Sequence, residues 1–255
     1  MKTIIKLSLV ILAMVSIASC KKYLDVTPDN VATIDYAFRN RNEAENYLFT
    51  CYSTLQHSGM GDVTANPGFT TSGEIIFPYP TPELLINPTG FNIIRGTQNI
   101  IAPALDYWDG QNQGVSLFTA IRRCNIFLEN VDEPIDLSDY EKTRWIAEAK
   151  FLKAYYHFWL LRLYGPIPII KKNLPVSSST EEVRVKREPV DSVFNYIVAL
   201  LDEAAKDLPV NIENEAAEEG RITRPIALAV KAEVLVTEAS PLYNGNTAYA
   251  SVKNK

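Results

Sequence analysis

Cys20 is the residue whose surroundings most clearly predict a chemical reaction. Two lysines precede an apolar run, residues 7–17, which is too short to span a bilayer as a mature helix but suits an export signal. The run closes on IASC at residues 17–20, which looks like a bacterial lipobox. Small residues let a peptidase approach the backbone, and the thiol is the nucleophile that accepts a diacylglycerol. We therefore expect residues 1–19 to be a lipoprotein signal peptide and Cys20 to carry the lipid anchor.

An ordinary secretory signal followed by an incidental cysteine is the alternative, but the position and the flanking residues favour the lipobox. Removal of residues 1–19 takes Lys2 and Lys6 away from 25 basic side chains, while all 30 acidic ones stay, so the net charge changes from −5 to −7. An acidic exported chain without a run of Lys or Arg has no electrostatic reason to bind nucleic acid or anionic lipid.

The residue types that commonly perform catalysis do not occur in catalytic motifs in this sequence. The two histidines, His57 and His157, are far apart, and neither belongs to a metal-ligand spacing such as HExxH. GxSxG, P-loop and GxGxxG motifs are absent from the sequence. The acidic pair Glu218-Glu219 lies in a charged loop and is expected to be solvated. The sequence therefore predicts no catalytic residue, no metal site, no cofactor and no enzymatic activity.

Residues 57–114 combine aromatic side chains with six prolines and eight glycines and show no helical periodicity. Irregular segments of this length are usually functional or disordered, and the aromatic content argues for order. A sugar ring has apolar C–H faces surrounded by hydroxyls, so a glycan site needs flat aromatic surfaces beside hydrogen-bonding groups. We expect the ligand-binding residues in this segment to be Asp62, Phe69, Tyr79, Phe91, Asn92, Arg95, Tyr107 and Trp108. The alternative, for Trp108 especially, is that the side chain only holds the loop against the helices.

Helical elements must position this segment. Apolar residues recur at helical spacing in five stretches, which are residues 40–56, 115–131, 138–164, 189–208 and 224–239. Asn40 or Asn42, Ser138 and Thr223 can cap three of them. Between them, 171–187 is a polar loop that could hold a short extended piece at Val183 and Val185.

These patterns predict an all-α fold. Residues 20–39 form a tether between the lipid anchor and a helical domain, residues 40–255, and the irregular segment 57–114 is an excursion from that domain. Residues 211–220 form an acidic loop near its end.

The helix that ends at Tyr164 has aromatic side chains around most of its circumference. Lys150, Lys153 and His157 share one narrow arc, which is the only stripe expected to face water. A helix with one core face needs only a narrow apolar arc, so this helix should pack between neighbours on two sides, with Trp159 buried. Gly165 and the prolines after it should end the helix.

Three other residues have apolar surroundings in the sequence pattern. Glu148 is expected to be a buried carboxylate that pairs with Arg122 or Arg123, rather than a catalytic acid. Cys51 and Cys124 could form a disulfide in an oxidising compartment, but buried free thiols are the commoner outcome for helical cysteines and are expected here.

Several stretches of the chain resemble one known family, the SusD/RagB nutrient-binding outer-membrane lipoproteins of Bacteroidetes. They follow the lipobox in the family's order and extend over nearly the whole chain: residues 23–26 (YLDV), 122–130 (RRCNIFLEN), 147–154 (AEAKFLKA), 164–168 (YGPIP), 223–224 with 227–235, and 240–245 (SPLYNG).

The resemblance implies tetratricopeptide-like helical hairpins, of which the aromatic helix would be the central member. It also implies a location at the outer membrane, an oligosaccharide or peptide ligand, and a role as a lid over a SusC-like, TonB-dependent transporter. Family members continue beyond the position of Lys255, which implies that this chain is truncated at its C-terminus. Lys21 and Lys22 stand where an acidic surface-export signal is often found in such lipoproteins.

Two other functions are compatible with parts of the sequence. A tetratricopeptide-like scaffold that assembles other envelope proteins would have a peptide groove and no aromatic platform, so the aromatic segment argues against it. A glycan-cleaving enzyme would need two carboxylates at a fixed separation across a cleft, which a sequence alone does not reveal.

Overall fold

The computed structural model describes residues 34–55, 99, 101, 103, 106–110 and 115–246, and every structural statement below refers to these residues. Residues 1–36 and 37–255 form separate units, and we describe the second. Its long helices are α3 (Arg41–Tyr52), α5 (Leu117–Asn130), α6 (Asp139–Tyr164), α8 (Val190–Asp207) and α10 (Arg224–Ala239). Four-residue helices are α2 (Ile34–Ala37), which ends at the start of this unit, α7 (Thr180–Val183) and α9 (Glu215–Glu218).

The described residues form no strand, and their one β-type contact is an isolated antiparallel bridge between Ile167 and Glu188. The prediction of an all-α fold is therefore confirmed. Among the described helices, none has both the length and the hydropathy that are needed to cross a bilayer.

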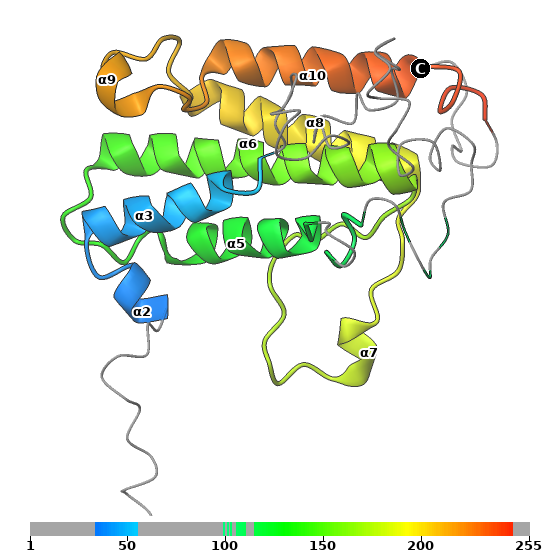
Figure 1. Cartoon of the computed structure of the whole chain (residues 1–255), viewed down its shortest axis with the longest axis horizontal. Coiled ribbons are helices and arrows are strands. Elements are labelled where there is room, and N and C mark those ends of the chain that lie inside the picture. The colour runs from blue at the N-terminus through cyan, green and yellow to red at the C-terminus, as the bar shows by residue number, and fades with distance from the viewer. Residues whose placement is uncertain are drawn as a thin grey trace, which may run out of the picture. The chain divides into compact units, whose positions relative to one another are not determined.

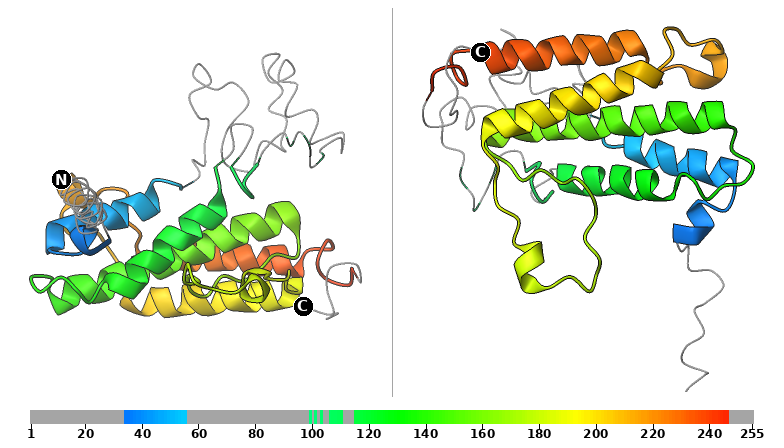
Figure 2. Two further views of the ribbon diagram at one scale, coloured as in Figure 1. Left: turned by 90° about the horizontal axis from the view of Figure 1, so that it is seen from below. Right: turned by 180° about the vertical axis from the view of Figure 1, so that it is seen from behind.

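α6 lies at the centre of the bundle (Figure 1). It contacts α3 and α5 on one side and α8 and α10 on the other, whereas α3 and α5 do not contact α8 or α10. α5 and α6 form one antiparallel hairpin, and α8 and α10 form another, as the views in Figure 2 show. The expected packing of α6 on two sides is confirmed, and Trp159 is only 4% exposed.

Local signals in the sequence set the ends of the helices. Ser138 and Glu141 form a capping box at the start of α6, and the Asn40 side chain accepts a hydrogen bond from the amide of Glu43 at the start of α3. Gly165 ends α6 with φ 69°, a backbone angle that favours glycine. Thr223 precedes α10, but its side chain makes no capping hydrogen bond.

The extended piece expected at Val183 and Val185 is wrong at Val183, which is the last residue of α7. Ser179 and Glu182 form a capping box there, and reciprocal bonds between these two side chains and backbone amides stabilise one helical turn. The Ser-x-x-Glu signal for a helix start was present in the sequence, but the prediction gave more weight to the β-branched valines.

The prediction that Lys153 and His157 face water is also wrong. Lys153 is 4% exposed and His157 is fully buried, because α8 and the segment after α6 cover this stripe. The His157 ring contacts Tyr196 of α8, and the Lys153 ammonium donates a hydrogen bond of 2.6 Å to the carbonyl of Lys171. Of the three residues, Lys150 alone stays partly exposed, and it pairs with Glu203. Lys153 and His157 can be buried here because backbone groups satisfy their polar atoms. Two of these groups, the Lys171 carbonyl and the Ile170 amide, belong to the following segment, and the third is the Lys153 carbonyl within α6.

The hydrogen bonds of His157 define its protonation. Nδ1 lies 2.7 Å from the carbonyl of Lys153, which can only accept, and the amide of Ile170 donates to Nε2 over 3.3 Å. His157 is therefore the neutral tautomer with its proton on Nδ1. Burial, with the nearby Lys153 charge, lowers the pKa of His157 to about 4.

Glu148 is a buried carboxylate paired with arginine, as expected, but its partners are not Arg122 or Arg123. They are Arg144, one turn earlier on α6, and Arg221, which precedes α10. Tyr52 of α3 donates a further hydrogen bond to the carboxylate. Burial raises the pKa of Glu148, while Arg221 and Tyr52 act against this rise. Arg221 was missed because the segment before α10 is remote in sequence, whereas Arg144 is an i,i+4 partner on the same helix that the sequence pattern contained.

Two more predictions concern Glu218 and the cysteines Cys51 and Cys124. Glu218 is not simply solvated, because it forms ion pairs with Arg144 and Arg221. Cys51 and Cys124 are buried free thiols, as expected. Burial raises the pKa of Cys124 well above its usual value, which disfavours the thiolate.

The first testable prediction concerns the central position of α6. Trp159→Ala should lower the free energy of unfolding by about 3–5 kcal/mol, because it removes a large buried side chain and leaves a cavity. Urea unfolding followed by circular dichroism measures this. Ile135→Ala is the matched control: Ile135 is 98% exposed, and its loss should change stability by less than about 0.5 kcal/mol. Equal effects of the two substitutions would contradict the packing described here.

The second prediction follows from the low pKa of His157. The unfolded chain binds a proton on this ring near pH 6.5 and the folded chain only near pH 4, so acidification through this window destabilises the fold by up to about 3 kcal/mol. His157→Gln removes the titrating group, so the pH profile of its unfolding free energy should be flatter between pH 6.5 and 4. Parallel profiles for the wild type and the variant would show that His157 is not held neutral.

Candidate functional site

The best candidate site is an aromatic cluster at the end of the bundle where α6 finishes. It consists of Trp108, Phe118, Tyr164 and Arg187, and we call it the Trp108 cluster. The Trp108 ring makes edge-to-face contacts with Phe118, at a centroid distance of 4.9 Å, and with Tyr164, at 5.3 Å. The guanidinium carbon of Arg187 lies 4.7 Å from the centre of the Trp108 ring. Aromatic pairs and cation–π contacts of this kind hold side chains in defined orientations.

Backbone hydrogen bonds fix the position of Trp108. The Asp106 carboxylate accepts hydrogen bonds from the amides of Trp108 and Asp109, over 3.0 and 3.1 Å, which makes a tight turn. The hydroxyl of Ser116 donates to the carbonyl of Trp108, and Gly110 completes the turn with φ 83°. The segment 106–110 is therefore held against the start of α5.

Tyr107 connects this turn to both neighbouring helices. Its amide donates to the hydroxyl of Tyr164 over 3.0 Å, and its carbonyl accepts from the amide of Leu117 at the start of α5. Burial raises the pKa of Tyr107 to about 12 and also raises the pKa of Tyr164. Both phenols are therefore neutral at physiological pH, and neither can act as a base.

Arg187 comes from a segment that follows Gly165 in the chain. The bridge between Ile167 and Glu188 brings the end of the 171–188 segment back to the end of α6. Arg187 donates a hydrogen bond of 3.3 Å to the carbonyl of Pro166, while the rest of its side chain is exposed. The charged group that the cluster presents to solvent is this guanidinium.

Two of the eight residues expected to bind ligand are described by the structure. Tyr107 is buried at 4% exposure, and Trp108 is partly exposed within the cluster. Asp62, Phe69, Tyr79, Phe91, Asn92 and Arg95 lie outside the described residues. Sequence reasoning missed Phe118, Tyr164 and Arg187 as neighbours of Trp108. Phe118 and Tyr164 carried a signal, since each is an aromatic residue at the end of an expected helix, but nothing local pointed to Arg187.

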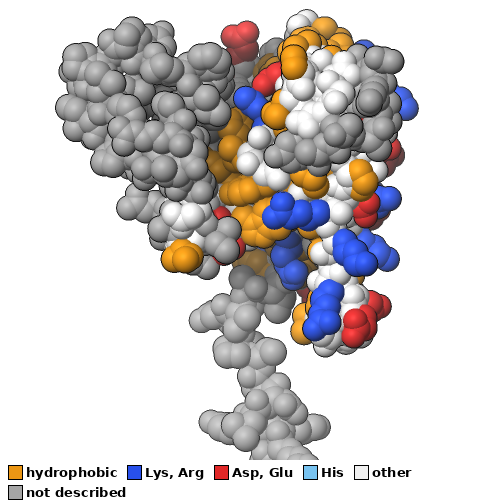
Figure 3. Space-filling view, turned by 90° about the vertical axis from the view of Figure 1, so that its right-hand side faces the viewer, with side chains coloured by type: hydrophobic (Ala, Val, Ile, Leu, Met, Phe, Trp, Pro, Cys, Tyr) orange, Lys and Arg blue, Asp and Glu red, His pale blue; other side chains and the backbone are white. Residues whose placement is uncertain are grey.

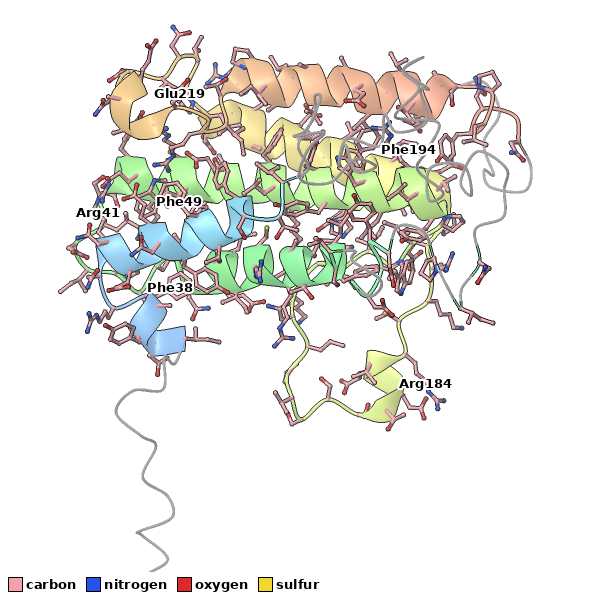
Figure 4. All side chains as sticks on the ribbon, viewed as in Figure 1. Phe38, Arg41, Phe49, Arg184, Phe194 and Glu219 are labelled. Carbon is pink, nitrogen blue, oxygen red and sulfur yellow. The ribbon has the colours of Figure 1, made fainter. Side chains whose placement is uncertain are left out.

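A polar cleft of about 570 Å³ lies at the opposite end of the bundle, where Arg41 and Phe49 of α3 are labelled in Figure 4. It is also lined by Tyr140, Arg144, Glu218 and the loop before α9. Both of its arginines already pair with carboxylates of the same cleft, Arg41 with Glu45 and Glu141, and Arg144 with Glu218. These charges are satisfied internally, so the cleft offers less for a ligand than the Trp108 cluster does.

The described residues contain no group of three or more His, Cys, Asp and Glu side chains that could hold a metal ion. The buried Glu148 is surrounded by arginines and does not reach either site. What the Trp108 cluster can do chemically is bind: it combines partly exposed aromatic surface with one oriented cation.

The family model and the curated relatives that match this chain are all SusD-like. The model of a family described as "Starch-binding associating with outer membrane", SusD-like, matches residues 92–235, which is more than half of the chain. A curated relative, SusD-like protein P25 from Formosa agariphila, is 22% identical over 223 residues, or 86% of this chain and 40% of the relative. A SusD-like protein from Bacteroides ovatus is 30% identical over 111 residues, which is 44% of this chain and 19% of that protein.

Solved structures share the fold. The structure named BT4246 is 32% identical, with a TM-score of 0.63 over 85% of this chain and 34% of its own. A laminarin-binding SusD-like protein is 18% identical, with a TM-score of 0.57 over 79% of this chain and 41% of its own. The chain thus spans at most about two fifths of the length of these proteins. Because the family model covers the α5–α6 hairpin, α8 and the Trp108 turn together, the chain belongs to the SusD-like family.

Proposed function

We propose that this protein is a cell-surface lipoprotein that binds a glycan and delivers it to a TonB-dependent transporter in the outer membrane. The observation that carries the proposal is that the SusD-like family match, residues 92–235, includes the Trp108 cluster and the helices that hold it. The cluster has the composition that a sugar site needs, with aromatic surface next to a hydrogen-bonding group.

Binding without catalysis is the function that the described side chains support best. The phenols of Tyr107 and Tyr164 are kept neutral, and the carboxylate of Asp106 already accepts two backbone hydrogen bonds. A glycosidase would need two carboxylates that face a cleft, one of which must exchange protons with the substrate. Among the described residues, the Trp108 cluster contains no such pair.

The aromatic side chains of residues 57–114 would extend this surface in our proposal. Phe69, Tyr79 and Phe91 would stack on sugar rings, and Asp62, Asn92 and Arg95 would bind hydroxyls. Solved proteins with the same fold include a laminarin-binding protein and a surface glycan-binding protein A from Bacteroides uniformis, so glycans are the ligand class to test first.

Delivery is the second part of the proposal. A SusC-like barrel would be the partner, and the helical bundle would close over its mouth as a lid after the glycan has bound. The lipid on Cys20 would keep the protein at the membrane, and the stretch between Cys20 and the helical unit, which begins at Ala37, would allow the lid to move.

The third testable prediction concerns the anchor. Cys20→Ala removes the thiol that accepts the lipid, so the protein should appear in the soluble fraction instead of the outer-membrane fraction. Fractionation and intact-mass measurement of the purified protein check this. A variant that stays in the outer-membrane fraction, with a mass that differs from the wild type only by the substitution itself, would contradict the lipoprotein assignment.

The fourth prediction concerns the glycan. The full chain should bind at least one polysaccharide in affinity electrophoresis, and Phe69→Ala, Tyr79→Ala or Phe91→Ala should weaken binding at least about fivefold, since an interface aromatic often contributes more than 1 kcal/mol. Tyr140→Ala is the control, because Tyr140 is a 66% exposed aromatic at the polar cleft. If Tyr140→Ala weakens binding and the other three do not, the polar cleft is the site instead.

A further inference from the structure

The Trp108 cluster presents a cation to its ligand beside its partly exposed aromatic surface. One face of the Trp108 ring is covered by the Arg187 guanidinium, and the ring also packs against Phe118 and Tyr164. A neutral sugar binds an aromatic platform by stacking on a free ring face. Because Arg187 occupies that position on one face of Trp108, a ligand that approaches this face meets the guanidinium first.

Arg187 also lacks a carboxylate partner among the residues that the structure describes. The arginines at the other end of the bundle, Arg41, Arg144 and Arg221, all form ion pairs. Arg187 instead uses one N–H for the carbonyl of Pro166 and leaves the rest of its planar fork of donors exposed. A guanidinium that is oriented by an aromatic ring and has spare donors is well prepared to bind a planar or tetrahedral anion through two hydrogen bonds.

The surroundings of Arg187 are basic although the whole chain is acidic. The 171–188 segment, which we call the basic excursion, extends away from the bundle and contains α7 (Figure 1). It has five basic residues, which are Lys171, Lys172, Arg184, Lys186 and Arg187, against the three glutamates 181, 182 and 188, whereas the chain has a net charge of −5. All five basic residues are exposed.

The buried carboxylate beside the cluster is engaged inside the turn that holds Trp108. It belongs to Asp106, which accepts hydrogen bonds from the amides of Trp108 and Asp109. Figure 3 views this end of the bundle and shows Lys and Arg side chains next to a hydrophobic area.

We propose that the ligand of this site is an anionic glycan, and that Arg187 is the residue that binds its acidic group, a uronic acid carboxylate or a sulfate ester. The proposal rests on the proposed glycan-binding function and specifies its substrate class. The basic excursion raises the local concentration of the polyanion, Arg187 binds one anionic group in two-point geometry, and the Trp108 ring keeps the guanidinium in place.

The experiment compares four polysaccharides by isothermal titration calorimetry on the full chain: polygalacturonate, which carries carboxylates, carrageenan, which carries sulfates, and the neutral laminarin and soluble starch. One of the two anionic polymers should bind more tightly than both neutral ones, and its affinity should fall as NaCl is raised. Arg187→Gln should weaken this binding about tenfold or more, since hydrogen bonds between charged groups are the strong ones. Arg187→Lys should lose part of that affinity, because it keeps the charge but not the fork.

Arg184→Gln is the matched control. It removes the same charge from the same excursion, but Arg184 lies near α7, away from the bundle (Figure 4). It should change the affinity much less than Arg187→Gln does. Circular dichroism and urea unfolding must show that both variants remain folded.

The outcomes separate this inference from the proposed function. Tighter binding of a neutral polymer, or equal losses for the Arg187 and Arg184 variants, overturns the anionic-glycan inference but leaves glycan binding intact. Absence of binding to any polymer in the wild type overturns the proposed function and the inference together.

Discussion

The fold depends most on the buried carboxylate of Glu148. This side chain has no exposure to solvent, so its charge is tolerated only because Arg144, Arg221 and Tyr52 surround it with hydrogen bonds of 3.0, 3.1 and 2.6 Å. These partners come from α6 itself, from the segment before α10 and from α3. The carboxylate is therefore satisfied only when three remote parts of the chain are in register, which selects one arrangement of the helices over others with similar apolar burial.

The rest of the bundle packs around α6, starting from the ion-pair network of Glu148. Ion pairs of Arg221 with Glu45 and of Arg144 with Glu218 extend the network to α3 and α9, and they close one end of the bundle. From Glu148 to Tyr164, α6 continues for about 24 Å at 1.5 Å per residue, packed between α3 and α5 on one side and α8 and α10 on the other. A helix packed on both sides cannot tilt or slide without disturbing both layers, so the end at Tyr164 is a rigid base for the Trp108 cluster.

The two ends of the bundle use arginine in opposite ways. At the Glu148 end, arginines and carboxylates neutralise one another and hold helices together. At the Tyr164 end, Arg187 rests on an indole ring and on a backbone carbonyl, so it is oriented without being neutralised. An aromatic ring can position a guanidinium while leaving its hydrogen-bonding edge open, whereas a carboxylate partner would occupy that edge. This difference makes the first end structural and the second a candidate for recognition.

Much of the architecture could be predicted from local sequence. The caps at Asn40 and Ser138, the stop at Gly165 and the apolar periodicity determine where helices begin and end, because these signals act within a few residues. The aromatic circumference of α6 likewise indicated a helix with neighbours on both sides, and Trp159 is buried as that pattern required. The resemblance of whole stretches to a known family supplied the family, which the match over residues 92–235 bears out.

What the sequence could not supply was the identity of partners that are remote along the chain. Lys153 and His157 have polar side chains and appeared to face water, yet the segment after α6 covers them and satisfies their polar atoms with backbone groups. Glu148 has one arginine partner on its own helix, Arg144, but its second partner, Arg221, depended on where the chain returns before α10. Arg187 became part of the candidate site only because the bridge at Glu188 brings it over Trp108. Helix ends are decided by neighbours in sequence, whereas charge pairing and burial are decided by neighbours in space, and only the tertiary structure specifies the latter.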